Sequence, residues 1–189
     1  SDKDAFEADH YDVKYFEGHL ARYKSPVYAQ RVRFVSDYMG EVTGARVLDL
    51  GCGIGWFGNM AKERGARVVG LDFSLDALLL AARHHPGLGL LRGDATTLPF
   101  PDGVFDLVLL NDIIEHLAEE PGRDMIEETF RVLKPGGALI VDTDNDEWLM
   151  GRKGFRRLND VLERRTPQRQ ALTEIKKTYD APTLHIKIY

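Results

Sequence analysis

Five short apolar runs recur along the middle of the chain without strict alternation of apolar and polar residues. Such runs are typical of strands that are buried on both faces of a parallel sheet. They fall at residues 46–50, 67–71, 88–91, 105–110 and 138–141. Helical patterns separate them, and this order predicts an α/β fold in which helices cover both faces of a doubly wound, mostly parallel sheet.

The helical segments have recognisable ends. Ser74 and the pair Ser25-Pro26 are typical helix starts, because a serine side chain accepts a hydrogen bond from a free amide of the first turn and proline fits the first helical position. Glycine or proline follows each segment and ends it. The expected helices lie at residues 26–39, 56–64, 75–85 and 123–133, with a further short helix near the N-terminus.

This pattern divides the chain into an N-terminal helical lid or cap (1–44), a core (45–144) and a C-terminal excursion (145–189). In the excursion, residues 148–178 are predicted to be helical and residues 183–189 to form a short strand. A sheet that ended after its fifth strand would expose an apolar edge. We therefore expect either that the C-terminal strands are incomplete because the chain is truncated, or that the tail strand or a second subunit of a homodimer covers the edge.

Composition and charge narrow the function classes. The chain has 189 residues, of which 43% are hydrophobic, and a formal net charge of -5. This is enough for one sizeable core, and the negative charge argues against broad binding to nucleic acid. No apolar run approaches the length of a membrane span, and the single cysteine, Cys52, excludes an intramolecular disulfide. We expect a cytoplasmic protein without nucleic-acid or membrane partners.

Acidic residues follow the predicted strands, where ligands bind in doubly wound sheets. Asp49 precedes a loop, residues 51–55, whose glycines allow a sharp turn and a close approach of ligand to backbone. Residues 53–58 match the dinucleotide-binding pattern G-x-G-x-x-G. However, Asp49 would repel a pyrophosphate, and no Lys or Arg lies between residues 51 and 58. The acidic edge instead favours a cationic ligand that also carries a ribose and an adenine.

Five motifs with plausible spacing occur in order along the core. They are VLDLGCGIG at 47–55, VGLDFS at 69–74, GDA at 93–95, FDLV at 105–108 with IEH at 114–116, and LKPGG at 133–137. Together they resemble the class I S-adenosylmethionine-dependent methyltransferases, in particular the ubiquinone/menaquinone-type and related small-molecule branch. The resemblance covers about residues 45–142. It implies a Rossmann-like sheet, S-adenosyl-L-methionine as cofactor, S-adenosyl-L-homocysteine as product, and methyl transfer to a small-molecule acceptor.

The resemblance also implies which residues hold the adenosyl group. Asp72 would accept hydrogen bonds from both ribose hydroxyls, and Phe73 would lie against the adenine. Asp94 would accept from the adenine amino group, while the Ala95 amide meets a ring nitrogen.

The methionine part of the cofactor is implied to lie on the glycine loop. Gly51 and Gly53 would pass it along their backbone, with Asp49 behind them near the ammonium group. The backbone carbonyl of Asn111 would accept from that ammonium group.

Asp112, Glu115 and His116 are three potential metal ligands that could converge, because residues spaced three and four apart share one face of a helix. Their spacing is similar to an E-x-x-E-H arrangement proposed to bind a divalent ion in some quinone O-methyltransferases. We favour the alternative that Glu115 and His116 brace the loop over the cofactor, and we expect no metal. His116 is the candidate catalytic base for an oxygen acceptor. Cys52 is expected to be a small loop residue rather than a nucleophile.

Several alternatives stay open. A non-catalytic module that binds S-adenosylmethionine fits the same motifs, and a nicotinamide-dependent oxidoreductase fits them less well. Tyr11 and Tyr15 are expected either to close over the cofactor or to pack on the core. A group of Arg and Lys residues in the C-terminal excursion is interpreted as a solvated helix face. The alternative is that it binds an anionic acceptor or an acidic partner. This basic set comprises Arg152, Lys153, Arg156, Arg157, Arg164, Arg165 and Arg169.

Overall fold

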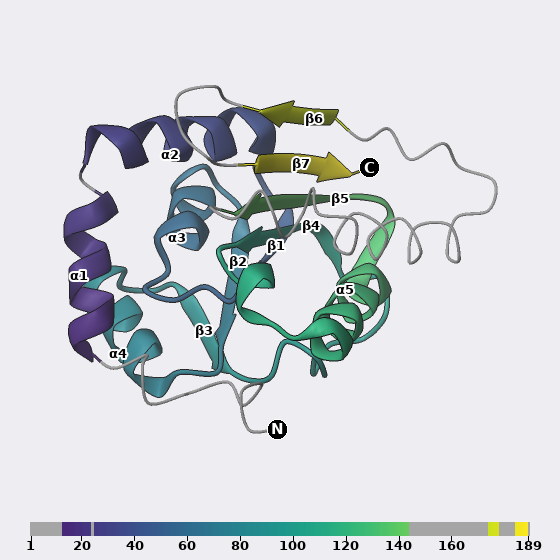
Figure 1. Ribbon diagram of the computed structural model, residues 1–189. Coiled ribbons are helices and arrows are strands. Elements are labelled where there is room, and N and C mark those ends of the chain that lie inside the picture. The colour runs from purple at the N-terminus through teal and green to yellow at the C-terminus, as the bar shows by residue number, and fades with distance from the viewer. Residues whose placement is uncertain (1–12, 24, 144–173, 178–183, 189) are drawn as a thin grey trace.

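The computed structural model describes residues 13–23, 25–143, 174–177 and 184–188. They form a seven-stranded sheet with the strand order β3-β2-β1-β4-β5-β7-β6 (Figure 1). The parallel strands are β1 (Arg46–Leu50), β2 (Arg67–Asp72), β3 (Gly89–Arg92), β4 (Phe105–Asn111) and β5 (Leu133–Thr143). The order of the strands reverses between β1 and β4, so the expected doubly wound sheet is confirmed, with its switch point between these two strands.

The helices begin where the sequence predicts serine caps. Ser25 accepts a hydrogen bond from the Tyr28 amide at 3.3 Å, and Ser74 accepts one from the Ala77 amide at the same distance. The helices are α1 (Val13–Tyr23), α2 (Pro26–Met39), α3 (Trp56–Glu63), α4 (Leu75–His84) and α5 (Glu119–Val132). α5 begins four residues earlier than predicted, because a proline is tolerated in the first turn of a helix. No helix in these parts of the chain is both long and apolar enough to cross a membrane.

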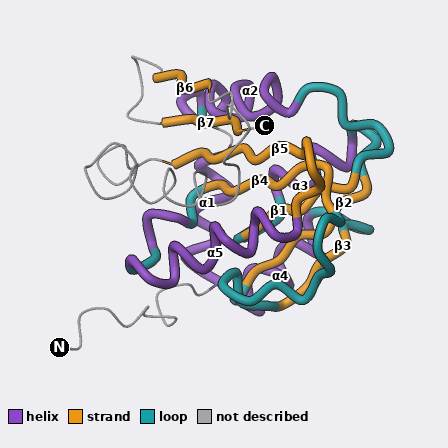
Figure 2. The backbone as a smooth tube through the Cα atoms, turned by 90° about the vertical axis from the view of Figure 1, so that its right-hand side faces the viewer, coloured by secondary structure: helices purple, strands orange, loops and turns teal. Residues whose placement is uncertain are grey.

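Helices cover both faces of the sheet, as Figure 2 shows from a second direction. Leu48 of β1 and Leu110 of β4 pack with Met125 of α5 in one core cluster. Their chain neighbours Val47 and Leu109 belong to a second cluster, which includes residues of α2 and α3. Alternate residues of each strand therefore point into opposite layers, which explains why these strands are apolar throughout.

The C-terminal strands complete the sheet. β7 (Leu184–Ile188) pairs antiparallel with β5, and β6 (Glu174–Lys177) pairs antiparallel with β7. The predicted coverage of the β5 edge by the tail strand is thus confirmed. One expectation was wrong: the helix predicted over residues 148–178 gives way to a strand at Glu174–Lys177, while residues 148–173 lie outside the described ranges. Glutamate and lysine favour helices only weakly, and here pairing with β7 overrides that preference.

Candidate functional site

A cavity of about 640 Å³ lies at the carboxyl ends of the parallel strands. It is bordered by the glycine loop after β1, by the ends of β2 and β4, and by the loops after β3 and β4. All nine residues predicted to form the site line it: Asp49, Gly51, Gly53, Asp72, Phe73, Asp94, Ala95, Asn111 and His116. The structure therefore brings together residues that are up to 67 positions apart, because the ends of parallel strands meet at one edge of the sheet.

The glycine loop lines the cavity, and two of its residues, Gly51 and Gly53, have no side chain. Gly51 and Gly53 have φ angles of 68° and 49°, in the left-handed region that favours glycine. A Cβ on Gly51 would come within 2.6 Å of Cδ1 of Ile113. The Gly51 amide donates to the Leu71 carbonyl at 2.8 Å, which ties the loop to the end of β2. The loop is thus held tightly between β2 and the segment after β4.

Asp72 organises two of the loops around the cavity. One carboxylate oxygen accepts from the Gly53 amide at 2.8 Å, and the other accepts from the Ser74 amide at 2.9 Å. The side chain is only 6% exposed, and this burial raises the pKa of Asp72. Asp72 can therefore accept hydrogen bonds from a ligand while it holds the glycine loop against the start of α4.

Asp49 is buried beside the glycine loop, where it contacts the first turn of α3. Its Oδ2 accepts from the Gly58 amide at 2.8 Å, and a Cβ on Gly58 would lie 2.8 Å from the same oxygen, so only glycine fits there. Burial raises the pKa of Asp49 to about 7, with the Gly58 amide acting against this shift and Asp72 adding to it. Asp49 is thus close to the midpoint of its titration near neutral pH, where a bound cation would favour its ionised form.

Cys52, within the same loop, is buried. Burial, together with the carboxylates of Asp49 and Asp72, raises the pKa of the Cys52 thiol well above its ordinary value. A thiol in this state is a poor nucleophile, in line with the expectation from the sequence.

Asn111, at the end of β4, has a buried side-chain amide without hydrogen-bond partners among the described residues. It is 7% exposed and borders the cavity. Neither its amide nitrogen nor its amide oxygen has a hydrogen-bond partner among the residues that the structure describes. Buried polar atoms rarely remain unpaired, so this amide points to a polar group supplied by a ligand.

Arg31 of α2 is a central residue near the site that the sequence analysis missed. It is 5% exposed and forms ion pairs with Asp112, after β4, and with Asp142, near the end of β5. The Tyr28 hydroxyl donates to Asp112 at 3.2 Å and is also hydrogen-bonded to the hydroxyl of Tyr23, which lines the cavity. Arg31 lies on the apolar face of its helix, and this was the signal that could have revealed its role.

Asp112 itself has a φ of 50°, which is uncommon for a residue other than glycine. Its amide donates to the Asp142 carbonyl at 2.9 Å. The contacts of Asp112 with Arg31 and Tyr28 thus hold a strained turn, and this turn sets the path of the segment that contains Ile113 and His116.

Asp112, Glu115 and His116 do not all face the cavity. His116 ends a short 3-10 helix (Ile114–His116) and lines the cavity, as does Asp112, whereas Glu115 does not. Burial, followed by the charge of Asp112, raises the pKa of Glu115 to about 7, while a hydrogen bond with the Thr143 side chain opposes this shift. Within the described ranges, no group of three or more His, Cys, Asp or Glu residues is arranged to hold a metal ion.

Aromatic residues of α1 close one side of the cavity. Tyr15, Phe16 and Tyr23 all line it, and Phe16 also packs with Ile54 of the glycine loop. Tyr11 and the basic set from Arg152 to Arg169 lie outside the described residues. Tyr15 borders the cavity, is 36% exposed and contacts its chain neighbour Phe16 edge-on, with ring centroids 5.1 Å apart, so its expected packing on the core is wrong.

Sequence comparison with known proteins finds methyltransferases. A family model described as a methyltransferase domain matches residues 48–141. The chain is 40% identical over 109 residues to a demethylmenaquinone methyltransferase from Renibacterium salmoninarum, covering 58% of this chain and 45% of that protein. It is 43% identical over 102 residues to a protein of the same name from Thermus thermophilus, covering 51% of this chain and 46% of the relative. The chain thus spans less than half the length of these relatives.

Solved structures match a larger share of the chain. The N-methyltransferase NodS from Bradyrhizobium japonicum, in complex with S-adenosyl-L-homocysteine, superposes with a TM-score of 0.69. The match covers 87% of this chain and 88% of NodS at 15% sequence identity. At this level of identity, the likeness establishes a shared fold.

Proposed function

The chain belongs to the class I S-adenosylmethionine-dependent methyltransferases, and from this premise we propose that it binds S-adenosylmethionine in the cavity and transfers the methyl group to a small-molecule acceptor. The observation that carries the proposal is the composition of the cavity. The glycines of the loop, buried carboxylates and the unpaired amide of Asn111 lie together at the switch point of the sheet.

The residues present fit this cofactor. Asp72 would hold the ribose, with Phe73 beside the adenine and Asp94 and Ala95 at the edge of the base. Gly51 and Gly53 would carry the methionine part. Asn111 and Asp49 would face its ammonium group, where the negative charge of an ionised Asp49 favours a cation. The same carboxylates disfavour the pyrophosphate of a nicotinamide cofactor.

S-adenosylmethionine, when bound, supplies a methyl group that is activated by the positive charge of the sulfur atom. The contribution of the protein is to hold the acceptor in line with that group and to exclude water. We infer that the aromatic residues of α1 act as part of a cap, because Tyr15, Phe16 and Tyr23 line the cavity. His116 would take the proton from an oxygen acceptor, and no metal is needed for this step.

The proposal is tested by calorimetry and by a transfer assay. We expect S-adenosyl-L-homocysteine to bind with micromolar affinity and NAD not to bind. Label from S-adenosylmethionine with a tritiated methyl group should appear in a small acceptor. The first acceptor to try is a short-chain demethylmenaquinol, since several relatives are named demethylmenaquinone methyltransferases. EDTA should leave the transfer unchanged. Tight binding of NAD would contradict the proposal, and binding without transfer to any acceptor would favour a non-catalytic module.

The titration of Asp49 predicts how cofactor binding depends on pH. The pKa of Asp49 is about 7, and a bound ammonium group stabilises the ionised carboxylate. Protonation therefore competes with binding below this pKa. The affinity for S-adenosyl-L-homocysteine should increase up to about eightfold between about pH 6 and about pH 7.5, as measured by calorimetry.

The matched control is Asp49→Asn, which can still accept from the Gly58 amide but cannot ionise. Its affinity should be nearly constant over this pH range. Glu115 has a similar pKa but does not line the cavity, so a pH dependence that persists in Asp49→Asn would show that Asp49 is not the group responsible.

A further inference from the structure

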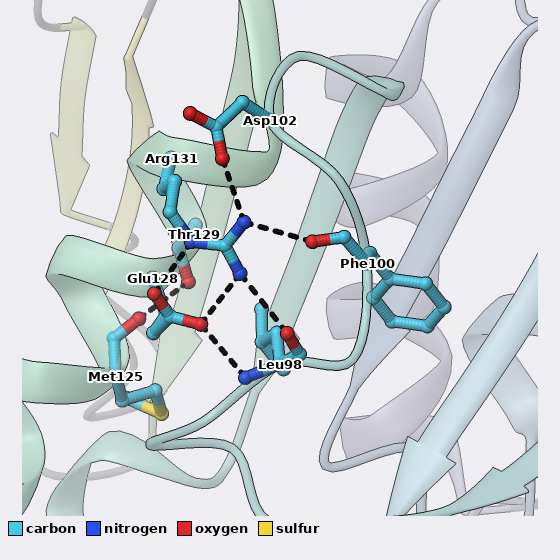
Figure 3. A network of polar contacts seen from close by, with 7 residues as sticks. All are labelled: Leu98, Phe100, Asp102, Met125, Glu128, Thr129 and Arg131. Carbon is cyan, nitrogen blue, oxygen red and sulfur yellow. Dashed lines mark hydrogen bonds and ion pairs between the residues drawn. The ribbon is translucent and has the colours of Figure 1, made fainter.

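Arg131, in the last turn of α5, binds the loop that connects β3 to β4 (Figure 3). Its guanidinium donates to the Phe100 carbonyl at 2.8 Å and to the Leu98 carbonyl at 3.0 Å. Glu128, one helical turn earlier, accepts from the Leu98 amide at 2.8 Å and from Arg131 Nε at 2.6 Å. Both backbone polar groups of Leu98 are therefore held by this pair of side chains.

The same end of α5 fixes other parts of the loop. The Gly103 amide donates to the backbone carbonyl of Arg131 at 3.0 Å. The Leu98 side chain is buried in the core cluster that contains residues of α5, and Ala95 packs against that cluster. The loop from Asp94 to Gly103 is thus attached to the helix at several points.

Asp94 and Ala95 form the end of this loop that borders the cavity. The amide and the hydroxyl of Thr96 both donate to Asp94 Oδ1 at 2.8 Å, which leaves Oδ2 to accept from a ligand. The carboxylate places an acceptor beside the backbone donor of Ala95. This pattern complements the edge of adenine, which offers an amino donor next to a ring-nitrogen acceptor, whereas hypoxanthine offers the reverse.

We propose that Arg131 and Glu128 are positioning residues for base recognition. By fixing Leu98, they hold the Asp94 acceptor and the Ala95 donor at the spacing that selects adenine over hypoxanthine. This inference rests on the proposed function, since it requires the adenosyl group to lie against Asp94.

The test compares the binding of two probes, S-adenosyl-L-homocysteine and S-inosyl-L-homocysteine, by calorimetry. The wild-type protein should prefer the adenine form by roughly 10- to 100-fold, because the hypoxanthine form reverses both hydrogen bonds. Arg131→Ala should lower this preference by at least about fivefold, since a loosely held loop loses the spacing of its two groups. The loss should come from weaker binding of the adenine form, with little change for the hypoxanthine form.

Two further variants separate positioning from stability. Arg131→Lys keeps the charge but cannot reach both carbonyls and Glu128 with a planar fork, so it should lower the preference even if Arg131→Ala does not fold. Asp102→Ala removes an exposed partner of Arg131 that does not touch Leu98 or Phe100. This control should keep the wild-type preference.

The outcomes distinguish the two proposals. If the wild-type protein binds neither probe, the proposed function fails. If it binds both equally, or if Arg131→Lys lowers the melting temperature and leaves the preference unchanged, then the positioning role is wrong while the proposed function stands.

Discussion

Replacing Asp72 by alanine is expected to weaken the binding of S-adenosyl-L-homocysteine by at least about 100-fold. The carboxylate would accept charge-assisted hydrogen bonds from two ribose hydroxyls, and each such bond contributes about 1.5–3 kcal/mol. The substitution also releases the Gly53 amide, which Asp72 holds at 2.8 Å, so the glycine loop loses an anchor. Calorimetry with the wild-type and variant proteins measures the effect directly.

The matched control is Asp76→Ala, in the first turn of α4. Asp76 does not line the cavity, so this variant should bind the product with the wild-type affinity. Asp72→Asn keeps one acceptor oxygen and should fall between the wild type and Asp72→Ala. An Asp72→Ala protein that is folded and binds with unchanged affinity would show that the ribose does not lie at Asp72.

Replacing Arg31 by methionine should lower the free energy of unfolding by about 3–5 kcal/mol, the usual cost of leaving a buried charge without its partner. Asp142 is completely buried, and Arg31 pairs with both Asp142 and Asp112. Methionine fills a similar volume, so the loss reflects the stranded carboxylates rather than a cavity. For a chain of this size, the melting temperature should fall by roughly 6–20 °C, as measured by calorimetry or circular dichroism.

Arg33→Met provides the control, since Arg33 lies on the exposed side of the same helix. Its free energy of unfolding should stay within about 0.5 kcal/mol of the wild-type value. Tyr28→Phe removes the hydrogen bonds of its hydroxyl to Asp112 and to Tyr23 and should cost about 1–2 kcal/mol. If Arg31→Met melted at the wild-type temperature, Arg31 would not be the residue that stabilises the two carboxylates.

Local patterns in the sequence were enough to predict the parallel part of the fold and the nine site residues that line the cavity. Local signals sufficed here: continuous apolar runs mark strands that are buried on both faces, and Ser74 caps a helix through its own side chain. Because ligands of doubly wound sheets bind where parallel strands end, Asp49, Asp72 and Asn111 could be assigned to one edge before any contact was known.

Which distant groups pair depends on the three-dimensional packing and could not be predicted from local patterns. Arg31 and Asp142 are 111 positions apart, and no local pattern specifies that α2 brings the guanidinium to the end of β5. The strand β6 pairs with β7, although three of its four residues are Glu or Lys, which are uncommon in strands. The attachment of the adenine-side loop by Arg131 depends in the same way on how α5 packs against the sheet. Such contacts arise from the packing of complete elements, and for Arg31 the trace left in the sequence is a charged residue on an apolar helix face.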